Sequence, residues 1–139
     1  MGQKLRKDSG FKVVGGRLVK GEPLEHRMQT QVVEWADLQA RAIPALACLY
    51  AVPNSAVRSK GDAGRMIEEG MRTGVPDLVL PVARGGFHAL YIEMKRHPNK
   101  VSDNQQKWIE RLRAQGNRVE VCWSANEAIT LLRSYLGMK

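Results

Sequence analysis

The chain has 139 residues, a length that corresponds to one domain at roughly 100–200 residues per domain. Hydrophobic residues make up 43% of it and charged residues 26%, which is the balance of a folded protein and excludes wholesale disorder. The net charge is +8 and the pI is near 9.9. So basic a domain favours a polyanionic partner, most simply nucleic acid, although charge alone does not identify that partner.

Membrane passage, secretion and a cysteine-based scaffold are not expected. The longest apolar stretch, from Ile43 to Val52, is far shorter than the roughly 20 residues that span a bilayer. The basic N-terminus is not followed by the apolar segment of a secretory signal, so we expect a cytoplasmic protein. Cys48 and Cys122 are far apart and lack CxxC spacing, which favours buried, reduced thiols over a disulfide or a zinc site.

Residues 1–22 form a basic arm that carries half of the net charge, and residues 23–139 form the expected domain. Within the arm, the β-prone runs 11–14 and 17–20 flank a Gly-Gly pair, which is a hairpin signal. Two interpretations stay open: a hairpin that contacts DNA or a partner subunit, and a disordered tail. After the arm, apolar residues at helical spacing predict a helix from Leu24 to about Ile43.

The rest of the chain alternates between β-prone runs and helical patterns. Two apolar runs joined across a Gly-Gly pair predict an antiparallel hairpin. Two helices are each marked by a serine with Gln or Glu three residues later, a capping box, and each ends at a glycine. After the first helix we expect a short buried strand or extended segment over 46–52 and a short helix over 63–69. A strand, a strand, a helix, a strand and a helix follow, over 78–82, 87–94, 102–116, 118–123 and 124–137.

Charged residues lie at the start of the first predicted hairpin strand and at the end of the second. Pro76 restricts the backbone on both sides of it, so Asp77 is positioned at the start of the first strand. Glu93 and Lys95 end the second strand and share one of its faces because strand side chains alternate. Each pattern has an ordinary explanation when it stands alone, a turn for the first and a solvated ion pair for the second.

A further carboxylate lies on the apolar face of the first predicted helix. At about 100° per residue, Glu25 and Gln29 point to the same side as Met28 and Val32, whereas Glu34 points away. Two readings remain open for Glu25: a role in a site, or the ordinary preference of the first helical turn for acids.

Together these residues fit the hydrolysis of a phosphodiester. Mg²⁺ is held by one or two carboxylates with waters and phosphate oxygens, and Asp77 with Glu93 provides that number. A bound metal acidifies the attacking water and offsets the charge of the phosphate. Lys95 could orient or deprotonate that water, or stabilise the developing negative charge.

The order of these motifs resembles the VRR-NUC domain, the virus-type replication-repair branch of the PD-(D/E)xK nuclease superfamily. The likeness runs from about Glu25 to Leu132 and implies a restriction-endonuclease-like α/β fold with an αβββαβ core, a mixed central sheet and flanking helices. The segments that carry it are Glu25-x-x-x-Gln29, Val52-Pro53-Asn54, Gly74-Val75-Pro76-Asp77-Leu78, Tyr91-Ile92-Glu93-Met94-Lys95-Arg96, Ser102-x-x-Gln105, Trp108 and Leu112-Arg113-x-x-Gly116.

The resemblance also implies roles for individual residues. Asp77, Glu93 and the main-chain carbonyl of Met94 would ligate Mg²⁺, with Mn²⁺ as a substitute, and Lys95 would be the catalytic lysine. Glu25 would be the acidic residue borne by the helix, and Gln105 a supporting glutamine. Small stand-alone members, often encoded by bacteriophages, are similar to Holliday-junction resolvases and act as homodimers. The resemblance therefore implies a role in DNA repair in the cytoplasm, which is the host cytoplasm if the protein is encoded by a phage.

Three function hypotheses follow: a structure-selective DNA endonuclease, a non-catalytic nucleic-acid-binding module of the same fold, and a nuclease acting on other DNA or RNA structures. Arg58, Lys60 and Arg65 precede Asp77 in a polar segment and are our candidate phosphate contacts. Side chains without ligand spacing, or on apolar helix faces, are interpreted as surface or core residues: His26, His88, His97, Trp35, Trp108 and Tyr135.

Overall fold

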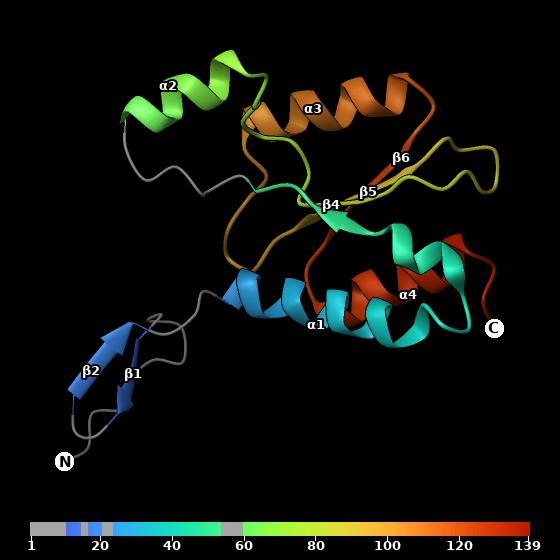
Figure 1. Ribbon diagram of the computed structural model, residues 1–139, viewed down its shortest axis with the longest axis horizontal. Coiled ribbons are helices and arrows are strands. Elements are labelled where there is room, and N and C mark those ends of the chain that lie inside the picture. The colour runs from blue at the N-terminus through green and yellow to red at the C-terminus, as the bar shows by residue number, and fades with distance from the viewer. Residues whose placement is uncertain (1–10, 15–16, 21–23, 54–59) are drawn as a thin grey trace.

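The computed structural model describes residues 11–14, 17–20, 24–53 and 60–139. Two strands pair with each other before the first helix, and the remaining elements build one layered unit (Figure 1). The elements are β1 (Phe11–Val14), β2 (Arg17–Lys20), α1 (Leu24–Gln39), the 3-10 helix η1 (Pro44–Cys48), β3 (Tyr50–Ala51), α2 (Lys60–Glu68), β4 (Leu78–Leu80), β5 (Leu90–Met94), α3 (Asp103–Ala114), β6 (Arg118–Cys122) and α4 (Ala125–Tyr135).

The centre of the fold is a mixed sheet of four strands in the order β3-β4-β5-β6. The first two pairings are antiparallel and the β5–β6 pairing is parallel. Helices α1 and α4 lie on one side of the sheet, and α2 and α3 on the other (Figure 1). With α2 inserted between β3 and β4, the order α1, β3, β4, β5, α3, β6 confirms the predicted αβββαβ core.

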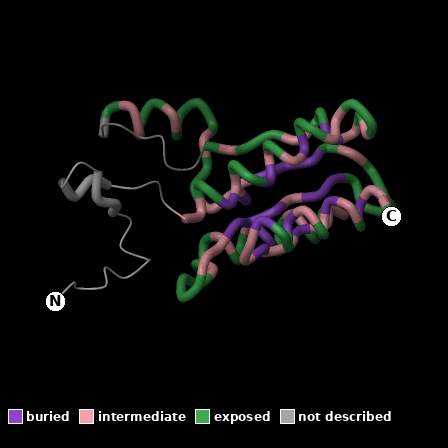
Figure 2. The backbone as a smooth tube through the Cα atoms, turned by 90° about the horizontal axis from the view of Figure 1, so that it is seen from below, coloured by how far each residue is buried: buried purple, intermediate pink, exposed green. Residues whose placement is uncertain are grey.

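Alternation along β5 divides the two faces of the sheet. Leu90, Ile92 and Met94 are buried in the apolar core with α1 and α4, and Figure 2 shows the buried segments gathered between the layers. Tyr91 and Glu93 project toward α3, where Gln105 donates a hydrogen bond to Glu93. The main apolar core therefore lies on the face covered by α1 and α4, while the face toward α3 carries Glu93 beside a smaller set of buried apolar residues.

The first helix and the segment after it differ from the sequence expectation. Helix α1 ends at Gln39, whose carbonyl accepts hydrogen bonds from the amides of Ala42 and Ile43 in a tight turn. Pro44 then begins a 3-10 helix, where its missing N–H costs nothing. The segment predicted over 46–52 therefore contains a strand, but only Tyr50 and Ala51 are extended. The prediction that this strand is buried is wrong, because both residues are exposed at the edge of the sheet.

The remaining elements follow the predictions, with local corrections. Strands β1 and β2 pair antiparallel, with Val14 opposite Arg17, and the Gly-Gly turn predicted between them lies outside the described residues. The predicted antiparallel pairing of β4 with β5 is confirmed. The capping box of Ser102 at the start of α3 is confirmed as well. At the start of α4 only half of the box forms, because the Glu127 carboxylate accepts from the Trp123 amide instead of the Ser124 amide.

The two cysteines occupy different environments. Cys122 is buried at the end of β6, as predicted, and its burial raises the pKa of the thiol to about 12. Cys48 is exposed, so the prediction of a buried thiol is wrong at that position. The reason is that η1 replaces the expected buried strand and turns Cys48 outward, whereas Leu46 of the same short helix is buried.

Candidate active site

The two predicted carboxylates meet at one end of the β4–β5 pair. Leu78 lies opposite Ile92 in the antiparallel register. Asp77, just before Leu78, and Glu93, just after Ile92, therefore lie at the same end of the strand pair. The Met94 amide donates a hydrogen bond of 2.8 Å to Asp77 Oδ2. The Asp77 side chain is therefore held against the last residue of β5, beside Glu93.

The loop that delivers Asp77 is anchored on both sides. The Val52 amide donates to the Asp77 carbonyl at 2.8 Å, which ties its backbone to the segment after β3. Asn104 Nδ2, at the start of α3, donates to the carbonyl and the hydroxyl of Thr73 at 2.8 and 3.0 Å. Gly74 has a φ of +85°, and a Cβ there would lie 2.7 Å from Asn104 Nδ2. Only glycine fits this contact without a shift of the loop or of Asn104.

Gln105 joins the start of α3 to Glu93. Its Oε1 accepts a hydrogen bond from the Ser102 amide at 2.9 Å, which completes the capping box. Its Nε2 donates to Glu93 Oε1, also at 2.9 Å. Both ends of this amide are therefore used, and the helix cap fixes the orientation of the carboxylate.

Glu93 is the one charged residue among those buried in the described part of the chain, with a relative exposure of 3%. Burial, and then the negative charge of Asp77, raise its pKa to about 8; Glu25 acts in the same direction, and the positive charge of Lys95 opposes them. Glu93 Oε2 is buried and accepts no hydrogen bond from the described residues. The pair therefore requires a positive species, either a proton shared between Glu93 and Asp77 or a cation.

The donor set fits a magnesium-type cation. A buried oxygen that lacks a donor, next to a second carboxylate, provides the hard anionic ligands that Mg²⁺ prefers. Within the described residues, no group of three His, Cys, Asp or Glu side chains forms a metal cluster. A cation here would thus have two carboxylate ligands, with its other positions open to main-chain oxygen, water and substrate phosphate, as is usual for Mg²⁺.

Lys95 and Glu25 complete the set of predicted residues. The Lys95 amide donates to the Cys122 carbonyl at 2.9 Å, which extends the parallel β5–β6 pairing by one residue. Its side chain is half-buried and stabilises the charged form of Glu93. Glu25, in the first turn of α1, accepts a hydrogen bond of 3.3 Å from Asn99 Nδ2. The structure therefore brings Glu25, Asp77, Glu93, Lys95 and Gln105 into one electrostatic and hydrogen-bonded group.

Asn99 and Asn104 were not among the sequence candidates. Each is a polar residue in a polar segment, and only the packing of α3 and of the loop after β5 brings them to the site. The predicted phosphate contacts are less defined. Arg58 lies outside the described residues, Lys60 contributes the first backbone position of α2, and the exposed Arg65 forms an ion pair of 3.4 Å with Asp62.

The aromatic and histidine side chains only partly follow the prediction. The three histidines are exposed, and His97 stacks on Trp123 with ring centroids 4.3 Å apart. Tyr135 is buried and Trp35 packs against the core, as expected. Trp108 is not a core residue: it is half-buried beside a pocket, and the Arg111 guanidinium lies 5.3 Å from its ring centroid. The spacing of apolar residues on α3 does not distinguish a residue in the core from one that borders a pocket.

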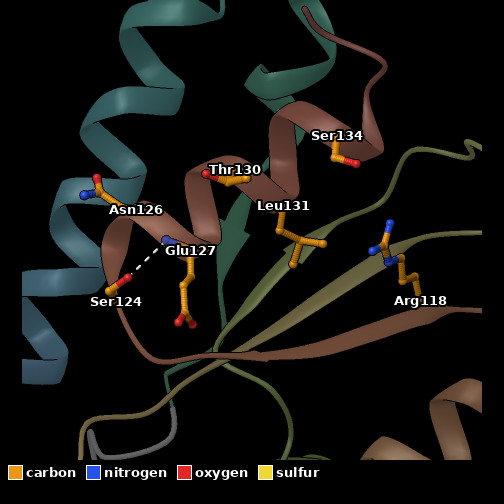
Figure 3. A pocket seen from close by; sticks show the side chains of 7 residues that line it. All are labelled: Arg118, Ser124, Asn126, Glu127, Thr130, Leu131 and Ser134. Atoms are coloured by element: carbon orange, nitrogen blue, oxygen red, sulfur yellow. Dashed lines mark hydrogen bonds between the residues drawn. The ribbon is translucent and has the colours of Figure 1, made fainter.

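A hollow lined by residues of α4 and by Arg118 of β6 contains none of the predicted site residues (Figure 3). Its single carboxylate, that of Glu127, is engaged with the Trp123 amide at 2.6 Å. Without a second carboxylate, this hollow does not provide the ligand set described above. The residues that line it are Arg118, Ser124, Asn126, Glu127, Thr130, Leu131 and Ser134.

Comparison with known proteins decides the family. The sequence matches the VRR-NUC domain over residues 18–126, most of the chain and the whole of the site. The chain belongs to the VRR-NUC family. A solved structure described as a VRR-NUC domain protein is 26% identical, with a TM-score of 0.72, and the match covers 86% of this chain and 93% of that one. None of the curated proteins compared with it matches.

The family assignment confirms the nuclease-type fold. The matched region of this VRR-NUC chain begins at residue 18, within β2, so it reaches into the basic segment that precedes α1. Among the described helices of this VRR-NUC domain, none has both the length and the apolar character needed to cross a bilayer.

Proposed function

We propose that the protein is a metal-dependent, structure-selective DNA endonuclease that acts as a homodimer on branched DNA, as Holliday-junction resolvases do, in the cytoplasm. The observation that carries this proposal is the pairing of Asp77 with the buried Glu93 beside Lys95, at the open end of two strands. Two carboxylates forced together in this way favour a divalent cation, and the net charge of +8 favours a polyanionic substrate.

The residues of the site have separate roles in the proposed reaction. Asp77, Glu93 and the main-chain carbonyl of Met94 hold Mg²⁺, for which Mn²⁺ substitutes. When bound, the metal supplies acidification of water and neutralisation of phosphate charge. Gln105 keeps Glu93 oriented through its 2.9 Å hydrogen bond. The Lys95 ammonium orients the attacking water and stabilises negative charge on the phosphate. Glu25 contributes further negative charge next to Glu93.

A homodimer follows from the geometry of the proposed substrate. A four-way junction has a two-fold axis, and symmetric cutting requires two active sites related by the same axis. Among its described residues a single chain buries one carboxylate, that of Glu93, and so provides one such site. Arg58, Lys60 and Arg65, in or next to α2, are the proposed phosphate contacts of each subunit.

The test compares cleavage of a labelled four-way junction with cleavage of a linear duplex of the same sequence, with Mg²⁺, Mn²⁺ or EDTA. We expect metal-dependent cuts that prefer the junction and are lost in Lys95→Ala. Lys139→Ala removes the same charge at an exposed position far along the chain and should cut as the wild type does.

Other results would redirect the proposal. Binding without cutting would indicate a non-catalytic nucleic-acid-binding module of the same fold. Equal cutting of junction and duplex would keep the nuclease and discard the preference for branched DNA. Cutting of RNA or flaps in preference to junctions would identify a nuclease with a different substrate.

A further inference from the structure

A pocket of about 480 Å³ lies on the same face of the sheet as the carboxylates, between the sheet, α2 and α3. Its floor is a row of three side chains that face one another across β3, β4 and β5: Tyr50, Val79 and Tyr91. Trp108 of α3 and Met66 of α2 also line it. The volume falls in the range of small-ligand sites, and the lining is mainly aromatic and apolar.

The strand register places the pocket next to the two carboxylates. Tyr91 precedes Glu93 by two residues on β5, and Val79 follows Asp77 by two residues on β4, so pocket and carboxylates occupy adjacent rows about 7 Å apart on one face. On α3, Trp108 lies one turn after Gln105, which binds Glu93. A ligand held at the carboxylates can therefore extend directly into the pocket.

The charge around the pocket matches a nucleotide and not a free apolar group. Arg72 lines it, and its guanidinium donates to the carbonyls of Ile67 and Met71. The Arg111 guanidinium lies against the Trp108 ring. The floor is open to solvent at Tyr50, which is 53% exposed. Flat aromatic surfaces flanked by arginines are how proteins hold unstacked bases next to a phosphate backbone.

We propose that this pocket binds an unpaired nucleobase of the DNA, stacked against Tyr91 and Trp108, while the adjoining phosphate lies at Asp77 and Glu93. The proposal rests on the nuclease function above and deepens it. Moving a base out of the stack costs least where that base is already unpaired. The pocket therefore provides a physical reason for a preference for DNA that contains unpaired bases over a fully paired duplex.

The test measures binding in EDTA, where no cutting occurs, by fluorescence anisotropy. Two labelled single strands of equal length and charge are compared, one of oligothymidylate and one in which every base is replaced by an abasic site. Wild type should bind the thymidylate strand at least about 5-fold more tightly, since stacking of a single base on an aromatic side chain has this size of effect. Trp108→Leu should reduce the gap to less than about 2-fold and leave abasic binding unchanged.

Trp35→Leu is the matched control, because Trp35 is also a half-buried indole on a helix but packs against the core on the opposite face of the sheet. It should keep the full gap. Tyr50→Ala serves as a second pocket variant at an exposed edge, where folding does not depend on the ring. Thermal unfolding of each variant confirms that it is folded before binding is compared.

Each other outcome overturns the inference. A wild type that cuts DNA but binds both strands equally refutes the pocket and leaves the nuclease intact. A gap that persists in both Trp108→Leu and Tyr50→Ala places base contacts elsewhere. A dimer in sedimentation that dissociates in Trp108→Leu assigns the pocket to a second copy of the chain. A wild type that neither binds nor cuts any DNA refutes the proposed function itself.

Discussion

Replacing Glu93 by glutamine should stabilise the metal-free protein and abolish cleavage. The substituted side chain keeps an oxygen to accept the hydrogen bond from Gln105 and places an amide N–H₂ where the buried Oε2 now accepts none. That amide can donate to Asp77 without a proton taken from solvent. The neutral side chain also removes the like-charge contact, and with it the anionic ligand that a divalent cation requires.

The size of the effect follows from the pKa of Glu93. Its ordinary value is 4.5, and in the folded protein it is about 8. Between these values the folded state holds a proton that the unfolded chain has released. The stability contribution is therefore fully present below pH 4.5 and is lost as the pH rises through about 8. At pH 7.5 the loss amounts to on the order of 4 kcal/mol, at 1.36 kcal/mol per pH unit, and Glu93→Gln should regain most of it.

Thermal unfolding in EDTA at pH 5 and pH 7.5 measures this. For a chain of this length the regained stability corresponds to a Tm increase of roughly 10 °C at pH 7.5, with little change at pH 5. Glu34→Gln, an exposed residue of α1 that faces away from the core, should change neither value. If Glu93→Gln lowers the Tm at pH 7.5, or shifts it equally at both pH values, the like-charge pair is not the source of the lost stability.

Further predictions concern the groups around the pair. Saturating Mg²⁺ should raise the Tm of the wild type more at pH 7.5 than at pH 5, because a proton competes with the metal at Glu93; Asp77→Asn should remove this shift, and a shift that survives would place the cation elsewhere. Gln105→Ala should lower cleavage by about 10- to 100-fold. Gln105→Glu, which keeps the helix cap but adds a like charge at 2.9 Å, should lower it further, so equal rates would contradict the orienting role. Gly74→Ala should destabilise the fold by about 1–3 kcal/mol more than Gly70→Ala in urea unfolding, since both have positive φ but only Gly74 meets Asn104, and Asn104→Ala should reduce the difference.

The site could be predicted from the sequence because its residues lie at the ends of regular elements. Period-2 alternation along β5 separates Glu93 from the core residues Ile92 and Met94, and the structure confirms that separation. The hairpin prediction then brings Asp77 to the same end, because antiparallel strands place the start of one beside the end of the other. The Ser102–Gln105 capping box marked the helix that orients Glu93.

What could not be predicted depends on packing between elements. In the sequence, Asn104 is one of several polar residues of α3. Only its hydrogen bond to Thr73 in the folded chain distinguishes it from the others. Trp108 fits the apolar face of α3 equally well whether it enters the core or borders a pocket. The strand predicted over 46–52 proved shorter than expected and exposed. A short apolar run bounded by prolines has the composition of a buried strand, and the turn after Gln39 is invisible to periodicity.

The contact between α1 and α4 has a consequence for how the molecule forms. These helices pack on each other and share the core on one face of the sheet, although nearly all of the described domain lies between them in the chain. The Tyr135 hydroxyl of α4 also reaches back to donate to the Val82 carbonyl at 2.5 Å. Until α4 has been synthesised, the part of the apolar side of α1 that packs on α4 stays exposed, and closure of so long a loop is slow. We therefore expect ribosome-bound chains that lack α4 to be sensitive to proteases and to associate with chaperones that bind exposed apolar surface.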